Sequence, residues 1–354
     1  MRGELIDSHG RVMRDLRVSV TDRCNYRCLY CLPETEEAAN FYRTKFDRIR
    51  NPGGSQVIAR TWKAKAELLS FEEIERIVRV AVGLGIEKVR LTGGEPLLRR
   101  GLPELAGMLG RIDGVRDLAM TTNGFLFAPQ AAALHSAGLK RVSFSMDSLD
   151  PVNFKKMTGR DGLKEVLEGI RLARELGFSP IKVNAVIIRT LNDHEIEDLA
   201  DFAQREELSF RFIEFMPLDS SRAWQRDHVV PGREILDRLE ARFELVPVDR
   251  QGNLSETARR WSFAGGRGEI GLISPVSEPF CGHCNRLRLT ADGKLRTCLF
   301  SMEDHDLRPL LRGGSSDEEL AATLIRIVLG KEKGHRIGQA DFVQPARTMS
   351  CIGG

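Results

Sequence analysis

The sequence lacks any long apolar run. No stretch approaches the ~18 consecutive apolar residues that a bilayer-spanning helix requires. The first residues, MRGELIDSHGRVMRDLR, contain no apolar segment of the kind found in secretory signals. We therefore expect a cytoplasmic protein with no membrane partner.

The chain also has little net charge. Lys and Arg number 53 and Asp and Glu number 50, which leaves a formal charge of +3. This balance supplies no broad positive field for nonspecific binding of nucleic acid. We expect no nucleic-acid partner, and any anionic ligand must be bound by local arginines.

Disorder is excluded as well, because 42% of the residues are hydrophobic and 29% are charged, which is ordinary for a globular protein. The 354 residues suffice for one large domain or for a domain with an appendage. We therefore expect a substantial core and room for two functional parts.

Cysteine is scarce, and six of the seven cysteines fall into two tight triplets. In chain order the cysteines are Cys24, Cys28, Cys31, Cys281, Cys284, Cys298 and the isolated Cys351. An odd number in two clusters, without a secretory signal, argues against a disulfide framework and for metal binding or redox chemistry. We interpret Cys351 as an incidental thiol.

Short β-branched runs alternate with amphipathic stretches over the first two thirds of the chain. The six candidate strands are 16–21, 88–92, 117–122, 141–146, 181–188 and 210–216. Apolar residues at helical spacing lie between them, as at 70–85, 162–177 and 193–207. This alternation predicts a parallel sheet with right-handed crossovers. Six units are fewer than the eight of a closed barrel, so an open three-quarter barrel and a doubly wound sheet both fit.

Polar motifs follow four of these strands. They are TDRCNYRC, GGEP, TTNG and SMDS, after the first to the fourth strand. In both sheet arrangements ligands bind at the carboxyl ends of the strands. We therefore expect the functional site there, with the first cysteine triplet in it.

The rest of the chain divides by composition. Residues 34–69 are longer than a usual strand-to-helix connection, and we interpret them as a lid or an insertion. We expect one domain over 1–230, a C-terminal region with the second triplet over 231–330, and a polar tail over 331–354.

The first triplet, C-x3-C-x2-C, has four interpretations. Structural zinc needs a fourth ligand, which the flanking residues do not supply. A bacterial ferredoxin has a different spacing. Three free cysteines so close together by chance would be unusual. What remains is a four-iron cluster with one iron left open, and open metal sites are where chemistry takes place.

This triplet, with the aromatic Tyr30 before its last cysteine, resembles the signature of the radical S-adenosylmethionine (radical SAM) superfamily. The GGEP motif at 93–96 resembles that superfamily's contact to the methionyl amino group. The resemblance implies an α/β fold of the partial (β/α)6 TIM-like barrel type. It also implies a 4Fe-4S cluster that binds S-adenosyl-L-methionine, whose reductive cleavage gives a 5′-deoxyadenosyl radical.

The second triplet, C-x2-C-x13-C, has two interpretations. With His283 as fourth ligand it would be a zinc knuckle, although a histidine between clustered cysteines points awkwardly for the same metal. As a second cluster with an open iron it would bind substrate. The following NRLRL places Arg286 and Arg288 on one face of a strand, which suits either a phosphorylated ligand or a solvated surface pair.

Over nearly the whole chain, the sequence is similar to the GTP 3′,8-cyclase family of molybdenum-cofactor biosynthesis. The matching segments are GRVMRDLRVSVTDRCNYRCLYC, KVRLTGGEPLLRR, TTNG, RFIEFMPL, GLISPVSEPFCGHCNRLRLTADGKLRTCLF and IGG. The main departure is the connection at 34–69, which is longer than the family's.

This resemblance implies a role for each matched position. The first triplet would hold the S-adenosylmethionine cluster, and the C-terminal extension would hold a second 4Fe-4S cluster whose free iron binds guanine. Around S-adenosylmethionine we expect Tyr30, Gly94, Ser145 and Met216. Contacts to GTP are expected from Arg17, Arg90, Thr121, Lys182, Arg211, Arg286, Leu287 and Arg288. Residues needed for catalysis would be Arg17, Arg286, Arg288 and the tail glycines Gly353 and Gly354.

The implied activity is that of a lyase that converts GTP to 3′,8-cyclo-7,8-dihydro-GTP. Expected partners are a reductant such as a flavodoxin or ferredoxin and, downstream, the cyclic pyranopterin monophosphate synthase, with a homodimer as one option for assembly. Two alternatives stay open at this point. One is a radical SAM enzyme that modifies peptides, and the other is a noncatalytic zinc scaffold.

Overall fold

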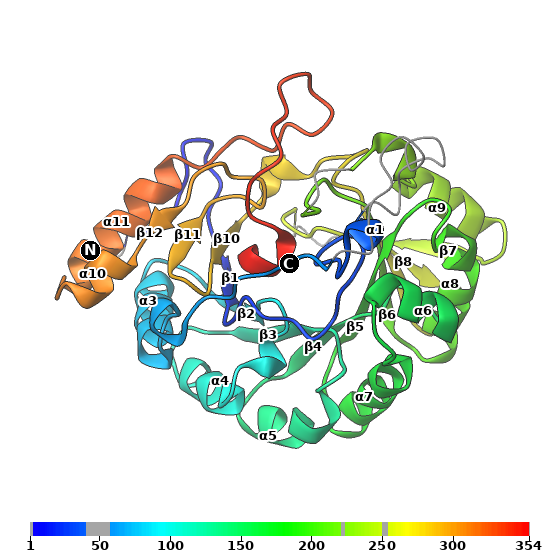
Figure 1. The fold of residues 1–354 in the computed structure, drawn as a ribbon, viewed down its shortest axis with the longest axis horizontal. Helices are drawn as coiled ribbons and strands as arrows, with labels where there is room; N and C mark the ends of the chain where they lie inside the picture. The colour runs from blue at the N-terminus through cyan, green and yellow to red at the C-terminus, as the bar shows by residue number, and fades with distance from the viewer. Residues whose placement is uncertain (1–2, 40–56, 221–223, 250–253, 354) are drawn as a thin grey trace.

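The structure is a computed structural model that describes residues 3–39, 57–220, 224–249 and 254–353. It has an α/β fold in which one curved sheet is surrounded by helices (Figure 1). In the described part of the chain the sheet has twelve strands, in the order β12-β11-β10-β1-β2-β3-β4-β5-β6-β9-β8-β7. Its end strands, β12 and β7, are not paired with each other there. The expected open partial barrel is thereby confirmed.

The centre of the sheet consists of six parallel strands in chain order. They are β1 (Asp15–Ser19), β2 (Lys88–Thr92), β3 (Asp117–Thr122), β4 (Arg141–Ser145), β5 (Ile181–Ile187) and β6 (Ser209–Glu214). Each boundary lies within two residues of the one predicted from the sequence. The prediction succeeds because these strands are short apolar runs between polar loops, and residues such as Val18, Leu91 and Phe144 are fully buried.

Helices between these strands cover the outside of the sheet (Figure 1). They are α3 (Phe71–Gly83), α4 (Leu102–Gly110), α5 (Ala131–Ser136), α6 (Pro151–Thr158), α7 (Leu163–Glu175) and α8 (Ile196–Arg205). The start of α3 illustrates how the sequence fixes them. Ser70 Oγ accepts a hydrogen bond from the Glu73 backbone N–H, and the Glu73 carboxylate accepts one from the Ser70 N–H, a reciprocal cap. Ile74, Ile77 and Val78 then face the core.

The C-terminal region extends the same sheet from both edges. On one side β9 (Glu269–Ile273) runs parallel to β6, and on the other β10 (Arg286–Leu289) runs parallel to β1. The remaining strands are antiparallel: β8 (Arg259–Phe263) and β7 (Leu245–Val248) beyond β9, and β11 (Lys294–Arg296) and β12 (His305–Asp306) beyond β10. The chain between β9 and β10 therefore passes from one side of the partial barrel to the other, and it carries Cys281 and Cys284.

Four further helices lie outside the central strands and their connections. They are α1 (Glu36–Ala39), α9 (Gly232–Glu240), α10 (Arg308–Arg312) and α11 (Asp317–Leu329). No helix of the described residues is both long and apolar enough to cross a membrane. The interpretation of 34–69 as a lid falls largely on residues 40–56, which lie outside the described residues.

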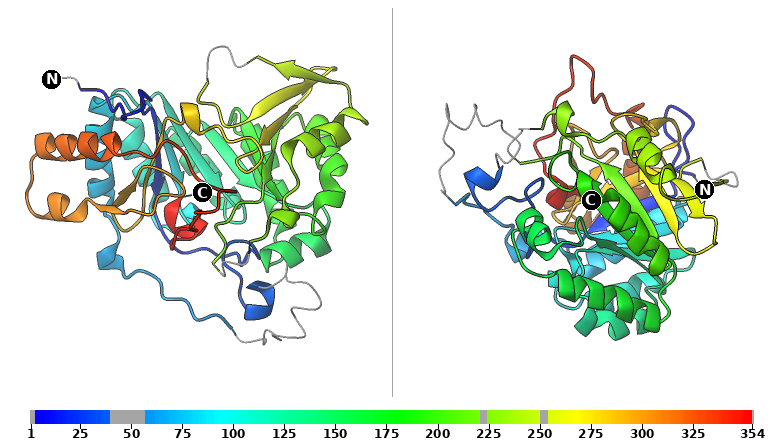
Figure 2. Two further views of the ribbon diagram at one scale, coloured as in Figure 1. Left: turned by 90° about the horizontal axis from the view of Figure 1, so that it is seen from above. Right: turned by 90° about the vertical axis from the view of Figure 1, so that its right-hand side faces the viewer.

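The tail ends inside the barrel mouth. A four-residue helix, α12 (Met349–Ile352), lies at the centre of the ring of strands in Figure 1 and among the strands again in Figure 2. Ile352 is fully buried, and Gly353 is buried too. Gly354 lies outside the described residues.

Candidate active site

The first cysteine triplet lies in the loop after β1, at the carboxyl end of the sheet as expected. The loop turns tightly at its end, where the N–H of Cys31 donates to the carbonyl of Cys28 over 3.0 Å. Burial raises the pKa of Cys28 well above its ordinary value, and the charges of Asp147, Cys24 and Cys31 raise it further. The three thiols therefore lie near one another. Such a group is stabilised when thiolates bind to metal.

Two other sequence motifs meet behind this triplet. Glu95 of GGEP accepts hydrogen bonds from the Thr122 hydroxyl and the Asn123 N–H of TTNG, both over 2.7 Å. The Asn123 side chain then donates to Cys24 Sγ at 3.8 Å and to Asn25 Oδ1 at 2.8 Å. Burial raises the pKa of Glu95 to about 7, although these hydrogen bonds by themselves would lower it. The motifs after β2 and β3 therefore support the cysteine loop after β1.

Gly94 lets the GGEP backbone approach the cysteine loop closely. Its N–H donates to the Thr21 carbonyl over 2.9 Å. A Cβ at Gly94 would lie 2.3 Å from the Arg23 carbonyl oxygen, which no real contact tolerates. Any larger residue would push the two loops apart.

The other three residues assigned to S-adenosylmethionine also lie at strand ends. Tyr30 donates its hydroxyl to Asp147 over 2.6 Å, and Asp147 also accepts the Val186 N–H over 2.8 Å. Ser145 is the last residue of β4, and Met216 follows β6. The structure thus places Tyr30, Gly94, Ser145 and Met216 around one mouth, after β1, β2, β4 and β6.

The cations assigned to GTP lie deeper than expected. We expected them at the carboxyl ends of the strands, but Arg17 and Arg90 are each the third residue of a five-residue strand. Arg17 pairs in register with Arg288 of β10 on one side and with Arg90 of β2 on the other. Because parallel neighbours in register point to the same face, the three guanidinium groups form a row inside the sheet.

The positive charges of this row repel one another. Burial lowers the pKa of Arg17 to about 10. The charge of Asp15 raises this pKa, whereas the charges of Arg286 and Arg90 lower it further. Arg288 is affected more strongly, with its pKa well below the ordinary value because of burial and then of Arg17 and Arg286. In the described part of the chain, Arg17 Nε has no hydrogen-bond partner. Buried like charges without carboxylate partners are costly, and a polyanion would relieve that cost.

The remaining assigned residues line the same interior. Arg90 donates to the Thr121 hydroxyl over 3.2 Å and to the Ser143 hydroxyl over 3.1 Å. Burial lowers the pKa of Lys182 to about 7, with repulsion from Arg211 and other cations adding to the shift. The structure therefore brings Arg17, Arg90, Thr121, Lys182, Arg211, Arg286 and Arg288 together. Leu287 differs, because its side chain is 1% exposed, so only its backbone could touch a ligand.

The second triplet lies where the crossing chain reaches β10. Cys281 begins a short 3-10 turn that ends at His283, Cys284 precedes β10, and Cys298 follows β11. Burial opposes ionisation of Cys284, but Arg286 and then Lys331 overcome it and bring its pKa to about 6. Burial raises the pKa of both Cys281 and Cys298, and the charge of Cys284 adds to each shift. These three thiols are therefore neighbours as well.

Over residues 3–39, 57–220, 224–249 and 254–353, no three His, Cys, Asp or Glu side chains are arranged to hold a single metal ion. A four-iron cluster makes a different demand, because each cysteine binds a different iron. Each triplet supplies three neighbouring thiols, with Asn123 beside one and Arg286, 3.4 Å from Cys284 Sγ, beside the other. This thiol-only donor set with polar neighbours is of the kind that iron-sulfur clusters use.

The tail contacts the row of cations. Arg288 donates to the carbonyl of Gly353, and to that of Ile352 over 3.3 Å. Burial raises the pKa of Cys31 to about 12, and the charges of Cys24 and then of Cys351, which we interpreted as incidental, add to this shift. Gly353 thus lies in the mouth, beside Arg288.

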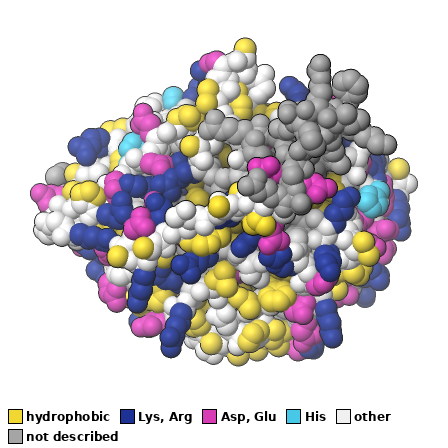
Figure 3. All heavy atoms as spheres, viewed as in Figure 1, with side chains coloured by type: hydrophobic (Ala, Val, Ile, Leu, Met, Phe, Trp, Pro, Cys, Tyr) yellow, Lys and Arg dark blue, Asp and Glu magenta, His cyan; other side chains and the backbone are white. Residues whose placement is uncertain are grey.

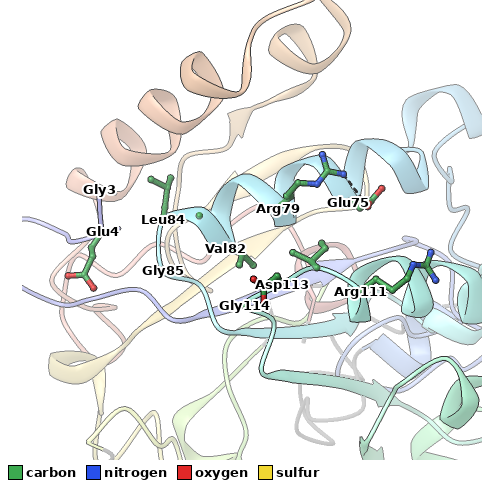
Figure 4. Close-up of a pocket in the computed structure, with 12 residues that line it drawn as sticks. Gly3, Glu4, Glu75, Arg79, Val82, Leu84, Gly85, Arg111, Asp113 and Gly114 are labelled. Carbon is green, nitrogen blue, oxygen red and sulfur yellow. Dashed lines mark ion pairs between the residues drawn. The ribbon is translucent and has the colours of Figure 1, made fainter. Parts of the chain in front are cut away.

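The large hollow drawn in Figure 4 is a different feature. It has a volume of about 720 Å³ and lies between the N-terminal segment, the end of α3 and the loop after α4. The only ion pair drawn there joins Arg79 to Glu75 over 3.1 Å. None of its lining residues belongs to either triplet or to the row of cations. On the face drawn in Figure 3, Lys and Arg side chains lie among Asp, Glu and apolar side chains.

Some residues of the site were missed from the sequence. Lys88 lies two residues before Arg90 on β2 and hence on the same face, a signal that alternation along the strand could have given. Asp147 and Asn123 lie inside the SMDS and TTNG motifs, but their contacts to Tyr30 and Cys24 join residues about a hundred positions apart. No local pattern reveals such pairs.

Comparisons with known proteins agree with this geometry. Residues 18–203 match the family described as Radical SAM superfamily, and residues 208–337 match the one described as Molybdenum Cofactor Synthesis C. Among solved structures, Streptococcus suis SuiB bound to S-adenosylmethionine aligns with a TM-score of 0.59 at 13% identity, over 89% of this chain and 69% of that one. A likeness at that identity concerns the fold alone.

Curated relatives match over nearly the full length. The chain is 45% identical to the GTP 3′,8-cyclase of Streptomyces coelicolor, over 99% of this chain and 96% of the relative. It is 44% identical to that of Rhodopirellula baltica, over 99% and 92%, and 42% identical to that of Syntrophomonas wolfei, over 99% and 100%. With both cysteine triplets and the cationic barrel in place, the chain belongs to the GTP 3′,8-cyclase family of the radical SAM superfamily.

Proposed function

We propose that this protein is a lyase that converts GTP to 3′,8-cyclo-7,8-dihydro-GTP, the first step of molybdenum-cofactor biosynthesis. The observation that carries the proposal is the row of Arg288, Arg17 and Arg90, which lie side by side in register on three neighbouring strands and of which Arg17 Nε has no hydrogen-bond partner among the described residues. A triphosphate carries several negative charges, and the guanidinium fork binds phosphate oxygens bidentately. The row is therefore the proposed binding site of the triphosphate.

The first triplet and its neighbours would bind S-adenosylmethionine. A 4Fe-4S cluster held by Cys24, Cys28 and Cys31 supplies one electron for cleavage of the sulfonium. Gly94 and Ser145 border the place for the methionyl part, and Tyr30 is held by Asp147. The 5′-deoxyadenosyl radical would take the hydrogen from C3′ of the GTP ribose, and the C3′ radical would then bond to C8 of guanine. The radical left on guanine at N7 would be quenched by one electron from the external reductant and one proton, which gives the dihydro product.

The second triplet would hold a second 4Fe-4S cluster, which would bind the guanine base. The triphosphate would be fixed at the other end by the row of Arg288, Arg17 and Arg90, with Lys182 and Arg211 as further cations. Such two-ended binding leaves C3′ facing the radical, and orientation of this kind is worth several orders of magnitude in rate. Leu287 would contribute its backbone to the base.

The enzyme would work in the cytoplasm with an external reductant, such as a flavodoxin or a ferredoxin. Its product would pass to the cyclic pyranopterin monophosphate synthase. Exclusion of water by the tail, through Gly353 and Gly354, would protect the radical. The internal position of the cations disfavours a peptide substrate, which needs an extended groove instead.

Deuterated substrate tests the reaction directly. Reconstituted enzyme is given S-adenosylmethionine, dithionite and GTP carrying deuterium at C3′, and the 5′-deoxyadenosine is analysed by mass spectrometry. The proposal predicts one deuterium in the 5′-deoxyadenosine and a product that is an isomer of GTP. If 5′-deoxyadenosine forms without deuterium while GTP is consumed, C3′ is not the position attacked.

A further inference from the structure

The segment Lys331–Gly334, which follows α11, contacts Cys281 of the second triplet and residues close to Cys284 and Cys298 in the chain. Lys331 is 3% exposed, an unusual degree of burial for a lysine. Its ammonium donates to the carbonyl of Arg286 over 3.1 Å and to the carbonyl of Thr297. Arg286 is two residues after Cys284, and Thr297 immediately precedes Cys298. One ammonium thus ties together the two chain segments that carry these cysteines.

The third cysteine is held by the same segment. A Cβ at Gly334 would lie 2.8 Å from Cys281 Cβ and 3.2 Å from its sulfur, so only glycine lets the segment pack on this thiol. Next to Lys331, the Glu332 carboxylate accepts a hydrogen bond from the Thr297 hydroxyl over 2.7 Å. The contacts to Cys281, to Arg286 near Cys284 and to Thr297 next to Cys298 therefore all come from four consecutive residues.

Arg11, which precedes β1, holds the segment in place. Its guanidinium donates to the Cys281 carbonyl over 2.8 Å, to the Lys333 carbonyl over 2.9 Å and to the Glu332 carbonyl over 2.5 Å. Asp7 fixes the guanidinium through an ion pair of 2.5 Å, and both side chains of that pair are buried. The donors of Lys331 and Arg11 are directed at backbone carbonyls, apart from Arg11 Nε, which donates to Asp7, so the arrangement is formed before any ligand arrives.

We propose that Lys331, together with Arg11, positions the second cysteine triplet and its cluster. The proposal rests on the second cluster of the proposed function. Lys331 is the central positioning residue, because removing it leaves two carbonyls next to Cys284 and Cys298 without their donor. Its positive charge beside the thiolates also favours the reduced, more negative form of a cluster bound there.

The experiment isolates the second cluster in the full chain. Cys24, Cys28 and Cys31 are changed to Ser, and Lys331→Met is compared with the parent and with Lys333→Met. The Lys333 side chain is exposed and only its backbone is used, so it is a matched control. Iron and sulfide content, the EPR spectrum of the reduced cluster and its midpoint potential are measured after anaerobic reconstitution.

We expect Lys331→Met to weaken cluster binding by about 10-fold or more, the usual effect of losing an outer partner. Whatever cluster remains should have a lower midpoint potential and an altered EPR spectrum, whereas Lys333→Met should match the parent. Equal iron content, spectrum and potential in Lys331→Met and the parent would overturn the proposal. A parent that holds no iron would instead refute the second cluster itself, and with it this inference.

A second background, in which only the first triplet is kept, distinguishes general misfolding from a specific effect on the second cluster. With Cys281, Cys284 and Cys298 changed to Ser, Lys331→Met should still load the first cluster as fully as its parent does. Loss of the first cluster as well would mean that Lys331 supports the fold in general, which contradicts a specific positioning role.

Discussion

Arg288 of β10 donates a hydrogen bond to the carbonyl of Gly353, so a residue of the proposed triphosphate site is occupied by the tail. Gly353 has a φ of +72°, and a Cβ there would lie 2.4 Å from Thr92 Oγ1 and 3.0 Å from Ser19 Oγ. The tail therefore fits between β1, β2 and β10 only because this residue is glycine. When GTP takes up Arg288, that contact must be exchanged for a phosphate contact.

Gly353→Ala should displace the tail, because the added methyl group meets Thr92 and a left-handed backbone. We expect GTP turnover to fall strongly while 5′-deoxyadenosine formation without GTP continues, since the first triplet is untouched. Gly314→Ala is the control, because Gly314 has a similar φ of +80° but its Cβ would meet nothing within 4 Å. Equal turnover in the two variants would show that the tail contact is not needed.

Arg17→Ala should weaken GTP binding and not the fold. Loss of a charge-assisted contact costs about 2 kcal/mol, or roughly a 30-fold rise in Kd. The free energy of unfolding of the ligand-free protein should stay level or increase, because a buried charge that repels Arg286 and Arg90 is removed. Calorimetry with GTP and thermal unfolding check both parts.

Arg116→Ala serves as the comparison for Arg17→Ala, because the Arg116 side chain is 76% exposed near the start of β3. Arg116→Ala should change neither the Kd for GTP nor the free energy of unfolding. If Arg17→Ala lowers the free energy of unfolding by as much as it weakens the free energy of GTP binding, the interpretation of the row as an anion site is wrong.

Lys182 should make GTP binding depend on pH. Its pKa is about 7 in the folded chain instead of 10.5, because burial and then Arg211 disfavour its charge. The unfolded chain therefore holds one more proton between pH 7 and 10.5, and the free energy of unfolding rises with pH in that range. GTP favours the charged form, so its binding should take up a proton, and its affinity should fall by at most about tenfold per pH unit above 7.

Titration calorimetry in two buffers of different ionisation enthalpy measures this uptake at pH 8. The matched variant is Lys182→Met, which should bind GTP more weakly and without the Lys182 proton. Identical proton uptake by the two proteins would rule out Lys182 as the group responsible.

Gly94→Ala should impair the first cluster and leave the second cluster intact. Its methyl group would lie 2.3 Å from the Arg23 carbonyl and push GGEP away from the first cysteine loop. We expect little 5′-deoxyadenosine, a depleted first cluster and a normal second cluster. Gly83→Ala, at the end of α3 with nothing within 4 Å of its Cβ, should behave as the parent. Normal 5′-deoxyadenosine formation by Gly94→Ala would contradict the close approach described here.

The sequence predicted those features that local pattern encodes. The six central strands and the motifs at their ends follow from short apolar runs between polar loops. The residues of the first triplet lie within eight positions, so their proximity was evident as well.

Features that depend on distant pairings were not predicted. The pairing of β10 with β1, which brings Arg288 beside Arg17, joins residues 271 positions apart and decides the depth of the cations. Burial of Lys331 and the contact of Arg11 with Cys281 arise in the same way, from packing of the C-terminal region on the edge of the sheet. Local spacing carries no information about such contacts.

The most direct measurement follows 5′-deoxyadenosine formation by anaerobically reconstituted protein with S-adenosylmethionine and dithionite, in the presence and absence of GTP. We predict that GTP stimulates 5′-deoxyadenosine formation and that a GTP-derived product appears in step. If 5′-deoxyadenosine forms but GTP neither stimulates it nor is consumed, the radical chemistry survives and the substrate assignment is wrong.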